Sequence, residues 1–181
     1  MWHAALLVSN ETEGSSPSSS FFEEKLSGSS SQSIDFGNFN TSKVNDMRNM
    51  FFIFGVNMDN VSLEGIEDWD VSNVTNMDNM FREAGYNSEK FSPKISNWDV
   101  SSVTNMYQMF YQAGYNSSSF ELNIAGWDVS SVSNMTWMFA GAGLNADYTL
   151  DLTEWKGKVS NVTDKYQFDK GVENKVIAPW D

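Results

Sequence analysis

The string "WDVSSVTNMYQMF", which begins at Trp98, restricts the fold of this chain more than any other feature because it is repeated. Closely matching strings begin 29 residues earlier, at Trp69, and 29 residues later, at Trp127. A degraded copy begins at Phe39 and another follows Trp155. Self-similarity at a fixed period of about 20–50 residues is typical of proteins that stack one structural unit on the next.

The period divides the chain of 181 residues into four parts. We expect a flexible polar segment, a degenerate half-repeat, four repeats of 28–30 residues and a degenerate capping repeat. These parts comprise residues 1–20, 21–38, 39–154 and 155–181. Terminal repeats are expected to be atypical, because one of their faces meets solvent.

Each repeat predicts a short strand followed by a short helix. Residues 98–100 alternate apolar and polar side chains, as on a strand with one buried face. Between Val103 and Ala113 the apolar residues change to helical spacing and form one stripe. Gly114 then suits the left-handed position that ends a helix. The sequence therefore predicts an α/β fold: a leucine-rich-repeat-like solenoid with short parallel strands on one face and short helices on the other.

The repeated tryptophans and the Met/Phe stripe are predicted to form the core. Trp69, Trp98 and Trp127 occupy the inward position of the predicted strand. The alternative, that these tryptophans are exposed platforms for sugars, stays open at this point. Trp137 differs from them, because it interrupts the stripe where other copies carry an amide. It is the candidate for an exposed aromatic residue.

Polar residues of the predicted strand face form the candidate binding surface. Asp70, Asp99 and Asp128 would stack about 5 Å apart and repel one another. Either each carboxylate accepts hydrogen bonds in the turn that follows, or Ca²⁺ or a basic partner occupies the row. We favour the turn, because no calcium-loop spacing is present. The three aspartates are therefore only speculative metal ligands. The candidate binding residues are Asp70, Ser72, Asp99, Ser101, Asp128, Ser130 and Trp137.

Composition excludes several classes of function. A formal net charge of −13 opposes binding to nucleic acid or to anionic membrane surfaces. The sequence has no cysteine and a single histidine, His3, which excludes thiolate zinc sites and most Ser–His triads. The repeated carboxylates single out no unique pair for acid–base catalysis. We therefore predict no enzyme, and no cofactor other than calcium under the second explanation.

The string "ISNWDVSSVTNMYQMF", which begins at Ile95, resembles the repeats of BspA-like leucine-rich-repeat surface proteins. This family is also called the Mycoplasma-lipoprotein or surface-protein repeat family. The resemblance covers about residues 34–168 and rests on three copies of W-D-V-S-x-V-[TS]-N-M-x-x-M-F in register.

The resemblance implies a non-catalytic binding module, adhesin-like or protein-recognising, in a cell-surface or secreted protein. The implied partner is a protein or glycan ligand on a cell or matrix surface, without direct membrane insertion. Two alternatives stay open: a structural spacer within a larger surface protein, and a cation-binding solenoid.

Overall fold

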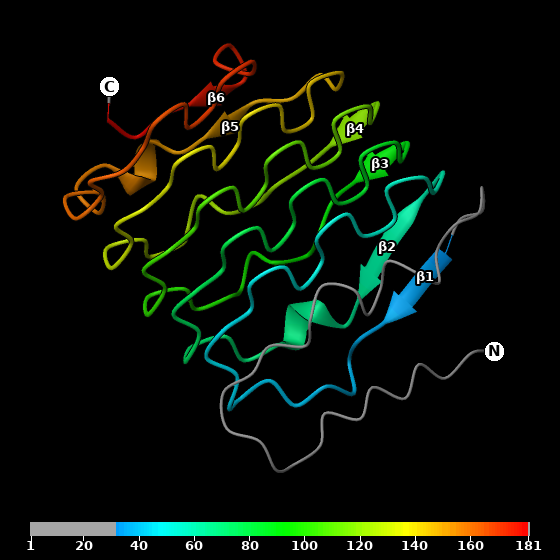
Figure 1. Cartoon of the computed structure of the whole chain (residues 1–181), viewed down its shortest axis with the longest axis horizontal. Helices are drawn as coiled ribbons and strands as arrows, with labels where there is room; N and C mark the ends of the chain where they lie inside the picture. Colours follow the sequence, from blue (N-terminus) through cyan, green and yellow to red (C-terminus); the bar gives the residue numbers. More distant parts are fainter. Residues whose placement is uncertain (1–31, 181) are drawn as a thin grey trace.

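The computed structural model describes residues 32–180. Successive repeats lie side by side in the order of the sequence, and the labelled strands follow one edge of the molecule (Figure 1). The predicted flexible segment 1–20 and most of the predicted half-repeat lie outside the described residues. The strands are β1 (Gln32–Asp35), β2 (Val61–Glu64), β3 (Lys90–Phe91), β4 (Ser119–Phe120), β5 (Leu150–Asp151) and β6 (Val176–Ile177).

The predicted α/β solenoid is wrong. Residues 32–180 contain no α-helix, and their helical elements are two 3₁₀ turns, η1 (Ile66–Asp68) and η2 (Thr153–Trp155). Nothing helical in this part of the chain is long and apolar enough to cross a bilayer. The strands form three two-stranded parallel sheets, β1–β2, β3–β4 and β5–β6, and most of the chain is turn and loop.

Neither of the two elements predicted within the repeat forms. The expected helix, residues 103–113, begins with an irregular stretch that contains the isolated bridge of Asn105 and becomes a continuous run of turns from residue 107. Residues 98–100, the expected strand, are not a strand. The strands lie instead in the segments that link one motif to the next. For example, β3 and β4 pair Phe91 with Phe120. The division into four full repeats and a capping repeat remains a prediction.

Hydrogen bonds between repeats explain why no helix forms. Along residues 77–84 the backbone amides alternate between two kinds of acceptor. The amide of Phe81 donates to the carbonyl of Met109 in the next repeat at 2.9 Å. The amide of Arg82 donates to Asn79 within its own turn at 3.1 Å. An α-helix would direct all these amides to acceptors four residues back. Here half of them hold neighbouring repeats together, and the backbone groups remain paired.

The repeated apolar residues form columns in the core. Phe81 and Phe110 stack with ring centroids 5.4 Å apart and planes 3° apart, and Trp98 and Trp127 stack at 6.5 Å and 5°. The indole N–H of Trp98 donates to the carbonyl of Ile66 in the preceding repeat at 2.8 Å. The predicted core is therefore confirmed.

Burial also decides between the two explanations for the repeated tryptophans. Trp69, Trp98 and Trp127 are 7%, 3% and 1% exposed. Side chains this deeply buried cannot stack on a sugar, so the alternative is excluded for these three.

The glycines that were expected to end helices have a different role. Gly114 has φ +55° and Gly143 has φ +54°, so the left-handed conformation was predicted correctly although no helix precedes it. A Cβ atom on Gly143 would lie 2.5 Å from Cγ of Phe120. Glycine is required there for both its backbone angle and its small size.

We expect Phe110→Ala to lower the free energy of unfolding by about 3–5 kcal/mol, the usual cost of truncating a buried aromatic residue. Phe110 is fully buried and stacks on Phe81 and on Phe139. Urea unfolding followed by circular dichroism measures the loss. The half-buried Phe52 provides the matched control, and an equal loss for Phe52→Ala would contradict the assignment of the core column.

Candidate functional site

The predicted aspartate–serine sites are turns closed by their own side chains. Asp99 is exposed, and its Oδ1 accepts the amide N–H of Ser101 at 3.1 Å and the Ser101 hydroxyl at 2.6 Å. Asp70 accepts the same two bonds from Ser72 at the same distances. The structural explanation for these aspartates is therefore confirmed, although they lie in turns and not on a strand. Their role in binding is a prediction.

The third copy follows the same arrangement. Asp128 is exposed and accepts the amide N–H of the exposed Ser130 at 3.1 Å. Side-chain and backbone hydrogen bonds from Ser130 lower the pKa of Asp128, and those from Ser72 lower the pKa of Asp70. Hydrogen bonding of this kind favours the ionised carboxylate. Each charge is thus stabilised within its own repeat.

A cation on this aspartate row has no structural support within residues 32–180. No group of three or more His, Cys, Asp or Glu side chains there is arranged to hold a metal ion. In each copy the Oδ1 atom already accepts at least one hydrogen bond from its own serine. Calcium normally takes six to eight oxygen ligands, which one carboxylate per repeat does not supply.

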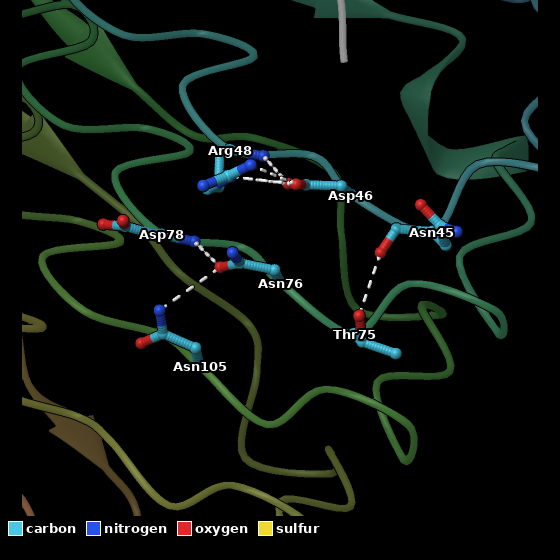
Figure 2. A network of polar contacts seen from close by, with 7 residues as sticks. All are labelled: Asn45, Asp46, Arg48, Thr75, Asn76, Asp78 and Asn105. Carbon is cyan, nitrogen blue, oxygen red and sulfur yellow. Dashed lines mark hydrogen bonds and ion pairs between the residues drawn. The ribbon is translucent and has the colours of Figure 1, made fainter. Parts of the chain in front are cut away.

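Another repeated column explains the asparagine that precedes methionine in each copy of the motif. Single parallel bridges connect Asp46, Asn76, Asn105, Asn134 and Asp164. Figure 2 shows Asn76 beside Asn105, whose Nδ2 donates to Oδ1 of Asn76 at 3.3 Å. Oδ1 of Asn76 also accepts the amide of Asp78 at 3.0 Å. An amide side chain both donates and accepts, so it can continue such a column without stacking like charges.

The first repeat carries an aspartate in place of asparagine at its position in this column. Asp46 occupies the column there and pairs with Arg48, with Nη2 and Oδ2 2.8 Å apart (Figure 2). Exposed hydroxyls link neighbouring repeats alongside this column, since Thr75 Oγ1 donates to the carbonyl of Asn45 at 3.2 Å. These repeated polar groups are occupied in holding the fold together.

A second surface differs from repeat to repeat, and we call it the variable face. It consists of the partly or fully exposed side chains of the turn segments, at positions where aligned repeats carry different residues. Core positions show the opposite pattern, since Met77, Met106 and Met135 are identical and fully buried. The variable face comprises Arg48, Asn49, Phe52, Ile53, Asp78, Asn79, Arg82, Glu83, Tyr107, Gln108, Tyr111, Gln112, Thr136, Trp137, Tyr166, Gln167 and Lys170.

Arg82 joins three repeats on the variable face. Its guanidinium carbon lies 5.4 Å from the ring centroid of Phe52 and 5.3 Å from that of Tyr111. Nη1 donates to Oε1 of Gln108 at 3.0 Å, and Nε pairs with Glu83 at 3.2 Å. Contacts between a cation and aromatic rings are worth roughly 0.5–1 kcal/mol at exposed sites. The side chain is therefore held in one orientation while 32% of it remains exposed.

Trp137, the remaining predicted site residue, lies on the variable face and not with the aspartates. Its ring meets Tyr111 at 5.8 Å and Tyr166 at 6.0 Å, both edge to face. Lys170 lies over the same ring, with Nζ 5.7 Å from the centroid. Trp137 is half-buried, and its indole N–H makes no hydrogen bond within the described chain, unlike that of the core residue Trp98.

The variable face also contains all the strained backbone of the described region. Its residues include every non-glycine with a positive φ between 32 and 180, and these recur four residues apart within a repeat. They are Asn49, Ile53, Asn79, Glu83, Gln108, Gln112, Trp137 and Gln167. A left-handed conformation costs an L-residue roughly 1–2 kcal/mol. Glycine would be unstrained, and Gly141 does occupy this position in one repeat.

Sequence analysis identified Trp137 but missed the rest of the variable face. The helical stripe consists of positions that are the same in each repeat and therefore predicts only the core. Recognition of a single partner requires positions that differ between repeats. The available signal was a comparison of non-core positions at the repeat spacing, such as Phe52, Arg82 and Tyr111.

Calcium should leave the stability of the protein unchanged, because the aspartate row lacks a ligand set. We expect identical melting temperatures with excess calcium chloride and with a chelator at fixed ionic strength. A site occupied at about 100 times its dissociation constant would add about 2.7 kcal/mol. A clear upward shift would restore the cation explanation for Asp70, Asp99 and Asp128.

Backbone strain on the variable face gives a second prediction. We expect Gln112→Gly to be more stable than Gln112→Ala by about 1 kcal/mol, because φ is +53° there. Thermal and urea unfolding of the two variants measure the difference. Tyr111, whose φ is not positive, is the control, and there alanine should be the more stable of the two. If the glycine variant were the more stable at both positions, or the alanine variant at both, the backbone strain assigned to Gln112 would be contradicted.

Comparison with known proteins places the chain in one family. Residues 18–114 and 52–180 match the family described as Mycoplasma protein of unknown function, DUF285. No curated protein and no solved structure matches the chain. The match agrees with the Mycoplasma-type repeat resemblance and indicates no catalytic family, whereas the leucine-rich-repeat assignment is not confirmed. Because the two matches together cover residues 18–180, the chain belongs to the DUF285 family.

Proposed function

We propose that this protein is a non-catalytic recognition module, adhesin-like in role, which binds its ligand through the variable face. One observation carries the proposal. Core positions such as Met77 and Met106 repeat unchanged. Partly exposed positions of the same turns vary among the repeats, and one of them carries Phe52, Arg82 and Tyr111 in three successive repeats. Stacking alone does not require such differences, whereas recognition of one ligand in one place does.

The residue types on the variable face support this role. Both arginines of the chain, Arg48 and Arg82, lie on it. Tyr111 and Trp137 contact each other there. Tryptophan, tyrosine and arginine are the residues most enriched among those that dominate binding energy at interfaces. The aspartate–serine turns present the same small polar group in each copy and are the weaker candidate.

Strained backbone gives separate support. Residues in sparsely populated backbone conformations cluster at functional sites, where the surrounding structure holds them. Ile53 is β-branched and has φ +49°, and Glu83 has φ +56°. The chain keeps large side chains at positions where glycine would be more stable, which is expected if those side chains serve recognition.

The setting that we propose is a cell surface or the extracellular medium, and it rests on the resemblance to BspA-like surface proteins. The spacer alternative makes a different prediction. A spacer needs only its core and its contacts between repeats, so substitutions on the variable face should change no binding.

The test compares two double variants with the parent protein. One carries Tyr111→Ala and Trp137→Ala on the variable face, and the other carries Asp99→Ala and Ser101→Ala. Binding to immobilised extracellular matrix proteins and to a glycan array is measured, after melting curves show that both variants are folded.

We expect at least one ligand whose dissociation constant rises about 30-fold in the first variant, the change that matches a dominant contact of about 2 kcal/mol. The second variant should bind like the parent. Equal losses in both variants would contradict the assignment of binding to the variable face. The absence of any ligand would contradict the proposal and favour the spacer.

A further inference from the structure

We infer that the ligand of the variable face is an uncharged glycan chain, bound along the aromatic and amide side chains of successive repeats. This inference rests on the proposed function and adds the chemical class of the ligand. The chemistry of the side chains on the variable face indicates which class of ligand this surface binds.

Aromatic rings provide the first part of such a site. Tyr111, Trp137 and Tyr166 form a continuous row, with centroid distances of 5.8 and 6.0 Å between neighbours. Tyr166 is 65% exposed, the largest exposed fraction among the large hydrophobic residues of the described chain. Tyrosine and tryptophan combine an apolar ring with a polar group. A sugar likewise combines an apolar C–H face with hydroxyl groups.

Amide side chains provide the second part. Gln108 and Gln112 lie in one repeat and Gln167 lies two repeats further along the chain; all three occupy strained left-handed positions and are partly exposed. Each amide offers both donors and acceptors, and each sugar hydroxyl does the same. A polymer with hydroxyls on every unit can therefore bond to amides supplied by more than one repeat. The indole N–H of Trp137 adds a donor that has no partner within the described chain.

Charge argues against an ionic ligand on this surface. The protein as a whole carries −13 and repels polyanions. Arg82 is already paired with Glu83 at 3.2 Å and enclosed by Phe52 and Tyr111. A cationic ligand would be drawn to the many exposed carboxylates elsewhere rather than to a face that carries its own cations. An uncharged polar ligand is neither repelled by the negative net charge nor drawn to carboxylates elsewhere on the protein.

The experiment uses the full chain and neutral oligosaccharides as probes. Cello-, chito-, xylo- and manno-oligomers of two to six units are titrated by calorimetry, in low and in high sodium chloride. The variants are Trp137→Ala, Gln112→Ala and the control Asn97→Ala, which removes an exposed amide outside the variable face and the aspartate–serine turns. Each is checked for folding by its melting curve.

We expect at least one hexamer to bind more tightly than its dimer, with a dissociation constant that does not depend on salt. Trp137→Ala should weaken binding at least 10-fold and Gln112→Ala several-fold, while Asn97→Ala should bind like the parent.

Three outcomes would overturn the inference: no binding by any neutral oligomer, binding that Trp137→Ala leaves intact, or preference for a charged polymer such as polygalacturonate with steep salt dependence. If a matrix protein binds and requires Tyr111 and Trp137 while every glycan fails, only the glycan class is wrong. If neither class binds, the proposed function fails as well.

Discussion

Backbone hydrogen bonds between neighbouring repeats are the interaction on which the rest of this structure depends. Alternate amides of each turn segment donate to carbonyls of the next repeat, as Phe81 does to Met109 at 2.9 Å. These bonds hold equivalent residues in columns, so Phe81 stacks on Phe110 at 5.4 Å. They also require a left-handed residue every fourth position, which gives the turn segments their strained backbone.

Each column meets a different physical demand. Apolar columns exclude water, and identical aromatic rings stack well because the repeats lie in register. The Asn76–Asn105 column is polar and partly buried, and only a side chain that donates and accepts can continue it. Aspartates such as Asp99 are repeated in the exposed turns, where serine hydrogen bonds stabilise the charge and solvent screens repulsion.

Stability and recognition are therefore assigned to different positions of one repeat. The buried positions and the polar columns hold neighbouring copies together, and their identity can be the same in every copy. The variable face contributes less to the core, so Arg82, Tyr111 and Trp137 can differ from their equivalents without disturbing the stack. Its strained residues lower the stability of the fold while they present side chains for binding, and such a compromise is common at functional surfaces.

Sequence by itself determined the period, the buried positions from Val103 to Ala113, the buried tryptophans and the left-handed Gly114. It also favoured the aspartate–serine turns over a cation site. It did not determine the backbone, because apolar residues three or four apart are buried equally well by a helix and by consecutive four-residue turns. Only the tertiary structure decided between them, since the amide of Phe81 finds its acceptor in another repeat. The variable face likewise emerged only when Arg82, Tyr111 and Trp137, which are distant in sequence, came together between repeats.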